Sequence, residues 1–150
     1  MTVKEYRMEA EAANREVSSK FKYVTDKLKY GFFETWSVID ISKPVWEGDC
    51  EDYSLTVLWL MSDKKKKAFL FNILFHPDYR MHFVRYKATK EGHAVLHYKG
   101  KFCDNIQQKW FTKKDEEYTR YDWKWPIFGF IVCINLVLGK IIKRVVKPGG

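Results

Sequence analysis

The strongest constraint on the fold is a change of hydrophobic period along the chain. Up to Leu28, apolar residues recur at steps of three and four, which is typical of one face of an amphipathic helix. From Tyr79 onward, apolar and polar residues partly alternate, which is typical of strands with one buried face. Helical patterns followed by an antiparallel meander predict the α+β class.

The helical pattern predicts one N-terminal helix of roughly six turns. It is expected to end at Tyr30-Gly31, because glycine can adopt the left-handed conformation that caps a helix. Residues 32–44 have no sustained period and predict a loop that contains Trp36. The stripe consists of Ala10, Ala13, Val17, Phe21, Val24 and Leu28.

A second helix is predicted just after residue 49. Asp49 is a suitable N-cap, and Glu51 and Asp52 would lie in the first turn, where acidic groups suit the helix dipole. The apolar run 55–61 indicates that this helix is buried. Cys50 is therefore expected at the very start of a buried helix.

The later part of the chain is expected to form the sheet. Residues 69–75 are apolar throughout and are compatible with either a helix or a strand. The strands are expected over residues 81–86, 93–98, 102–105, 109–112 and 118–123.

Composition indicates one folded domain. The chain has 150 residues, 46% of them hydrophobic and 17% aromatic, which excludes a disordered chain and allows a sizeable core. Its net charge of +8 is accounted for by the basic residues of two short clusters. There is no continuous basic stripe of the kind that binds a phosphate backbone, so we expect no nucleic-acid partner. The clusters are residues 64–67, and Lys140, Lys143, Arg144 and Lys147.

The cysteines indicate a reducing compartment. Cys50, Cys103 and Cys133 cannot form an even set of disulfides, and none has the spacing of a zinc site. The first twenty residues are polar and helix-forming and do not have the pattern of a signal peptide. We therefore expect free thiols and a cytoplasmic location.

Three residues could form a thiol catalytic site. Cys50 at a helix N-terminus would have a lowered pKa, His93 at a strand start could act as base, and Asp104 after the next strand could orient the imidazole. Each residue taken alone is more often structural. Three other histidines compete for the role of base, namely His76, His82 and His97.

Residues 15–105 resemble the bacterial transglutaminase-like cysteine proteinases, a branch of the papain/transglutaminase fold. The hexad around Cys50 and the strand motif around His93 are the most specific features. The matching segments, in order, are Tyr23-Val24-Thr25-Asp26, Tyr30-Gly31, Trp36, Gly48-Asp49-Cys50-Glu51-Asp52-Tyr53, Gly92-His93-Ala94-Val95-Leu96 and Asp104-Asn105.

The resemblance implies a catalytic Cys at a helix N-terminus, packed on an antiparallel sheet. It implies that Cys50 is the nucleophile, His93 the base and Asp104 the orienting acid of a peptidase that cleaves peptide or isopeptide bonds through a thioester. Trp36 could support the oxyanion site or simply pack. Two alternatives stay open, which are acyl transfer of the transglutaminase or amidase type with the same triad, and a non-catalytic binding protein on the same fold.

The resemblance also bears on cofactors and origin. No cofactor is required by the triad chemistry, but acids matching Asp49 and Glu51 bind calcium in some relatives. The alternative is that Asp49 caps the helix and Glu51 serves its dipole. The compact form of the chain is similar to copies found in bacteriophage genomes, and its partner is expected to be a protein or peptide substrate.

The C-terminal segment is expected to differ from the peptidase domain, which we place at residues 1–124. Residues 125–139 are uncharged, and basic residues follow from Lys140. The run is shorter than the roughly twenty residues that a spanning helix prefers. Residues 125–150 could therefore be a buried core element, an interfacial helix or a short tail anchor, with membrane contact through residues 125–147.

Overall fold

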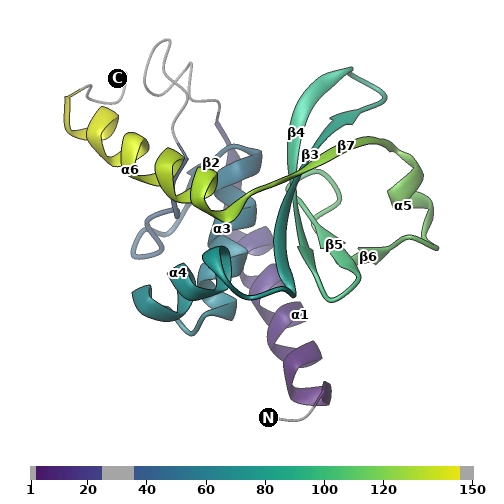
Figure 1. The fold of residues 1–150 in the computed structure, drawn as a ribbon, viewed down its shortest axis with the longest axis horizontal. Coiled ribbons are helices and arrows are strands. Elements are labelled where there is room, and N and C mark those ends of the chain that lie inside the picture. The colour runs from purple at the N-terminus through teal and green to yellow at the C-terminus, as the bar shows by residue number, and fades with distance from the viewer. Residues whose placement is uncertain (1–2, 25–35, 146–150) are drawn as a thin grey trace.

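A five-stranded antiparallel sheet lies beside a group of helices in the computed structural model, which describes residues 3–24 and 36–145 (Figure 1). This arrangement confirms the predicted α+β class. The helices are α1 (Val3–Lys20), α3 (Cys50–Met61), α4 (Lys66–Leu74), α5 (Glu116–Thr119) and α6 (Gly129–Val145).

The main sheet has the order β6-β5-β4-β3-β7. Its first four strands in the chain form the predicted meander. The last strand, β7, does not continue beside β6 but pairs with β3 at the opposite edge, where Val84 lies opposite both His93 and Trp123. The strands are β3 (Tyr79–Tyr86), β4 (Glu91–Tyr98), β5 (Lys101–Cys103), β6 (Phe111–Thr112) and β7 (Tyr121–Ile127).

The predicted N-terminal helix is wrong at its C-terminal end. Helix α1 ends at Lys20, and β1 (Phe21–Tyr23) pairs in parallel with β2 (Trp46–Gly48), a strand that the sequence did not predict. The ring of Phe21 also packs edge-on against Tyr53, with centroids 4.9 Å apart. Pairing and packing of this kind outweigh the helical period. The expected cap at Tyr30-Gly31 lies outside the described residues.

The ambiguous apolar run 69–75 is mainly helical. Most of it belongs to α4, which is anchored by Phe69, the buried residue of this helix, against Trp59 with ring centroids 5.4 Å apart. Apolar periodicity could not decide this because both faces of the segment carry apolar residues.

Two hydrophobic clusters hold the helices and the sheet together. The larger lies between helices and sheet and includes Val17, Tyr53, Leu58 and Leu96. The smaller consists of Val84, Val95, Phe102, Phe111 and Tyr121. In β4, Leu96 belongs to the first cluster and Val95 to the second, as expected of a strand whose side chains alternate between two faces.

The C-terminal segment is integrated into the fold on one side. The predicted boundary between residues 124 and 125 falls within β7, and α6 follows directly. Val132 is buried, and a side chain added at Gly139 would place its Cβ 2.4 Å from the carbonyl oxygen of Trp36, so α6 packs closely on that segment. None of the helices in the described residues has the length and apolar content that crossing a bilayer requires.

Candidate active site

The start of helix α3 is shaped by reciprocal hydrogen bonds. The N–H of Asp52 donates to the side chain of Asp49 at 3.4 Å, and the N–H of Asp49 donates to the side chain of Asp52 at 3.3 Å, which confirms the predicted N-cap. A Cβ at Gly48 would lie 2.7 Å from the Cβ of Asp52, so this approach requires glycine. The backbone at Cys50 is therefore held in a defined geometry.

The same helix also holds the segment that contains Trp36. The second oxygen of Asp52 accepts the N–H of Ser37 at 3.0 Å, and the hydroxyl of Thr56 accepts the N–H of Ile39 at 2.9 Å. Trp36 is partly buried and packs against the larger hydrophobic cluster. Its role in supporting an oxyanion stays a prediction.

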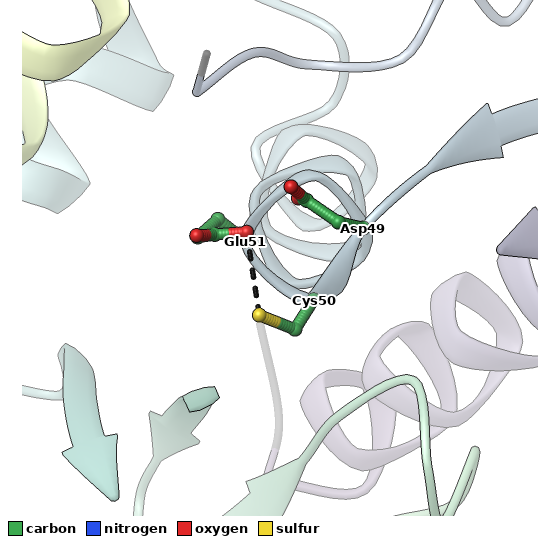
Figure 2. A group of neighbouring side chains, drawn as sticks. All are labelled: Asp49, Cys50 and Glu51. Carbon is green, nitrogen blue, oxygen red and sulfur yellow. Dashed lines mark hydrogen bonds between the residues drawn. The ribbon is translucent and has the colours of Figure 1, made fainter. Parts of the chain in front are cut away.

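The thiol of Cys50 lies beside two carboxylates, as Figure 2 shows. Its Sγ donates to Glu51 Oε2 at 3.3 Å. Burial raises the pKa of Cys50 well above its ordinary value, and the charges of Glu51 and Asp49 raise it further, whereas the backbone N–H of Ala94 lowers it. The prediction of a lowered pKa is wrong, because desolvation and two adjacent negative charges outweigh the helix dipole.

The imidazole of His93 is bonded to the carboxylate of Asp104. His93 Nε2 lies 2.7 Å from Asp104 Oδ2, and both side chains are buried, that of Asp104 completely. Asp104 Oδ1 accepts the N–H of Gln107 at 2.9 Å. Because Nε2 is engaged by the carboxylate, Nδ1 is the ring nitrogen left to exchange a proton with another group.

Tyr121 completes this arrangement and was not found by sequence reasoning. Its hydroxyl donates to Asp104 Oδ2, the oxygen that also binds His93, and its ring stacks on the imidazole with centroids 5.8 Å apart and planes at 11°. Burial and the charge of Asp104 raise the pKa of Tyr121, so the phenol stays protonated. In the sequence Tyr121 is one aromatic residue of a strand, with no motif around it.

Cys50 and His93 line one open cavity of about 330 Å³. Asn105, which follows Asp104, lies at its wall, and its buried Oδ1 has no hydrogen-bond partner among the described residues. A ligand in this cavity would meet a thiol and an imidazole, with Asn105 at the wall. The complete lining is Tyr23, Cys50, Tyr86, Thr89, Glu91, Gly92, His93, Asn105 and Ile106.

The competing histidines have other partners. His82 Nε2 lies 3.4 Å from His97 Nδ1, and the pair is surrounded by aromatic rings. Burial is the main cause that lowers the pKa of His82 to about 4 and lowers that of His97 as well. The ring of His76 packs on Tyr79 and accepts the N–H of Asp78. Of the four histidines, the structure brings His93 together with Asp104.

The other two thiols lie away from this cavity. Cys103 is completely buried and donates to Asn14 Oδ1 at 2.9 Å. Cys133 is partly buried on α6. Burial raises the pKa of both thiols, and for Cys103 the charge of Asp104 raises it further.

The acids next to Cys50 form a potential metal site. One ligand atom from each of Asp49, Cys50 and Glu51 lies within 4.8 Å of the others. Two carboxylates suit a hard cation such as calcium, which takes six to eight oxygens, so backbone carbonyls and water would have to complete the shell. The donor set fits calcium in kind, although Asp49 also serves as the helix cap.

Comparisons with known proteins identify the family and the fold. The family model of the bacterial transglutaminase-like cysteine proteinases (BTLCP) matches residues 1–128. The fold is similar to that of Legionella pneumophila LapG, with a TM-score of 0.58 at 18% identity over 93% of this chain and 78% of LapG. For EGTA-treated Legionella pneumophila LapG the TM-score is 0.51 at 19% identity, over 81% of this chain and 61% of that one. No curated protein matches the sequence.

Proposed function

We propose that this chain, which belongs to the bacterial transglutaminase-like cysteine proteinase family, hydrolyses peptide or isopeptide bonds with Cys50 as nucleophile. In this proposal His93 is the general base and Asp104 orients it. The observation that carries the proposal is the 2.7 Å contact between His93 and Asp104 at the wall of a cavity that Cys50 shares.

The proposed reaction uses these groups in turn. His93 Nδ1 takes the proton of the Cys50 thiol while Sγ attacks the substrate carbonyl carbon. The C–N bond then breaks, the amine leaves with the proton from His93, and a thioester remains. Water attacks the thioester, gives its proton to His93, and releases the carboxylic acid and the thiol.

The resting state in this proposal is a neutral thiol. Burial and the two neighbouring carboxylates raise the pKa of Cys50, which favours transfer of the proton to His93 during the attack. The carboxylate of Asp104 accepts a hydrogen bond from His93 Nε2, which leaves His93 Nδ1 to act as the base. Backbone N–H groups at the start of α3 are suitable donors to the oxyanion of the tetrahedral intermediate.

Asn105 is suited to binding the substrate. Its Oδ1 is a buried acceptor at the cavity wall with no partner among the described residues, and a peptide N–H would satisfy it. This supports a protein or peptide as the substrate class. We expect Asn105→Ala to raise KM more than it lowers kcat, because the contact forms in the bound substrate as well as in the transition state.

A covalent probe tests the nucleophile directly. The full chain would be treated with a peptidyl vinyl sulfone and its intact mass measured, followed by peptide mapping. We expect one adduct on Cys50, none with Cys50→Ala, and an unchanged adduct with Cys133→Ala as the control thiol. Equal labelling of Cys50→Ala would contradict the proposal. Added amines would then show whether the thioester goes to water or to an acyl acceptor.

We also propose a calcium ion held by Asp49 and Glu51, a proposal supported by the cluster of ligand atoms around Cys50. A bound calcium ion would supply positive charge beside two carboxylates that otherwise stand close together. Titration calorimetry should show calcium binding that Glu51→Gln weakens at least tenfold, while the N-cap is left intact. A calcium affinity that Glu51→Gln leaves unchanged, or equally tight binding of magnesium, would contradict this site.

The setting of the proposed enzyme is also open to experiment. A cytoplasmic location, a bacteriophage origin and the lack of a nucleic-acid partner stay predictions from the sequence. Fractionation of cells that produce the chain would test the first of these.

A further inference from the structure

The outer side of α6 is apolar. Its large side chains recur at steps of four, three, one and three, so they share one helix face, and each is between 49% and 58% exposed. Figure 1 shows α6 at the outer edge of the helical side of the molecule, away from β5 and β6. The residues of this face are Phe130, Ile134, Val137, Leu138 and Ile141.

The apolar face continues beyond the helix. Phe128 is 65% exposed and stacks on Phe130 with ring centroids 6.2 Å apart. Trp125, 59% exposed, and Phe128 line one cavity together, and Phe75 lines another with Phe128. We call Trp125, Phe128 and the five residues above the α6 surface. Continuous exposed apolar areas of this kind mark interaction sites.

One lysine of each basic cluster lies next to this surface. Lys66 and Lys140 line the same cavity of about 640 Å³, which lies where α4 packs against α6. Lysines 64–67 are all exposed. Two acids are nearby, Asp63, which contacts Lys65 at 3.5 Å, and Asp40 at the cavity wall. After Asp122 the sequence has no further acid and has the basic residues Lys124, Lys140, Lys143, Arg144 and Lys147.

Lysines 64–67, at the start of α4, occupy electrostatically unfavourable positions. They surround the positive end of the helix dipole, and the first turn of α4 has no acidic residue. Lys64 also adopts a positive φ of 56°, a conformation that costs energy for a residue with a side chain. An external anionic partner would stabilise this arrangement.

We propose that the α6 surface docks on an anionic lipid bilayer. The apolar side chains would enter the interfacial region, and Lys66, Lys140 and their neighbours would contact the head groups. A second copy of the chain fits less well, because a symmetric contact through α6 would bring like-charged clusters together. This inference does not depend on the proposed peptidase activity.

Vesicle flotation of the full chain tests the proposal. We expect binding to phosphatidylcholine vesicles that contain phosphatidylglycerol, weaker binding to phosphatidylcholine alone, and loss of binding at high salt. Ile134→Ser with Val137→Ser should reduce partition at least tenfold. The matched control is Val45→Ser, a change at an apolar residue that is 48% exposed outside this surface. Lys66→Gln with Lys140→Gln should cost about fivefold for each charge removed.

Three outcomes would overturn the proposal. One is no partition into the phosphatidylglycerol vesicles, and another is an equal loss with Val45→Ser and with the α6 double variant. The third is a stable dimer in sedimentation velocity that the α6 double variant dissociates, because the occupant would then be a second copy. Melting curves of each variant show that the fold is retained, and labelling of Cys50 by the vinyl sulfone reports separately on the proposed peptidase site.

Discussion

Two histidines on the same strand, His93 and His97, have opposite surroundings. His93 lies against the carboxylate of Asp104 and beneath the ring of Tyr121. His97 lies against His82 and stacks on Phe102, with ring centroids 4.5 Å apart. The residue type and the strand are the same, so the difference comes entirely from what neighbouring elements bring to each ring.

The comparison shows what makes an imidazole suitable as a base. A carboxylate at one ring nitrogen stabilises the protonated ring and fixes which nitrogen faces the substrate. A second histidine and aromatic rings do not stabilise a protonated ring in this way, and burial lowers the pKa of both His82 and His97. His97 is partly buried with a lowered pKa, whereas His93 contacts the carboxylate of Asp104.

The largest effect is expected when the two histidines are replaced separately. His93→Ala should lower kcat/KM by about 10⁴-fold, because in the proposed mechanism the imidazole both accepts the thiol proton and passes it to the leaving amine. His97→Ala should leave kcat/KM within about threefold, since the residue contacts neither Cys50 nor Asp104. Steady-state hydrolysis of a peptide that the enzyme accepts provides the measurement. A larger loss with His97→Ala than with His93→Ala would show that His93 had been wrongly assigned as the base.

The next effect is expected from removing the charge of the orienting acid. Asp104→Asn retains the shape of the side chain but no longer stabilises the imidazolium, so kcat should fall by about 10³-fold with KM little changed. Asp122→Asn is the matched control, because that acid is exposed and contacts Lys124. Comparable losses in the two variants would show that Asp104 has no special role.

A smaller effect is expected from the hydroxyl of Tyr121. Tyr121→Phe retains the stacked ring and removes one donor to Asp104 Oδ2, so the carboxylate should be held less firmly in line with the imidazole. The expected loss in kcat/KM is about tenfold, which corresponds to one hydrogen bond of about 1.4 kcal/mol.

Separate measurement of kcat and KM distinguishes positioning of the imidazole from packing. Tyr118→Phe serves as the control, because Tyr118 stacks on Trp123 in the same group of rings. A rise in KM with kcat unchanged, or an equal loss of rate in Tyr118→Phe, would contradict a positioning role for Tyr121.

The last prediction concerns stability rather than rate, namely acid stability and the other histidine pair. The pKa of His82 is about 4 in the folded protein against 6.5 ordinarily, so between these values the unfolded chain binds a proton that the folded one does not. Stability should therefore fall as the pH drops from about 6.5 to about 4, by about 2 kcal/mol for a ring that is partly solvated. His82→Phe should reduce this loss in urea unfolding at the two pH values. An identical pH dependence in the variant would contradict it.

Much of the fold could be read from local patterns. The α+β class, the N-cap at Asp49 and the β3–β4 hairpin depend on residues close in sequence, and each is found in the structure. The end of α1 was missed because Phe21 exchanges a helical position for pairing with Trp46, a residue that the sequence places far away. The path of β7 to β3 was missed for the same reason.

The sequence alone placed Cys50 at a helix start, His93 in a strand and Asp104 after the next, because caps and alternation are local properties. Only the tertiary structure decided which histidine meets the acid, that Tyr121 joins them, and that Lys66 and Lys140 meet beside one apolar surface. It also reversed the expected pKa shift of Cys50. The physical reason is that desolvation, charge and hydrogen bonding depend on distance in space, which the order of residues does not determine.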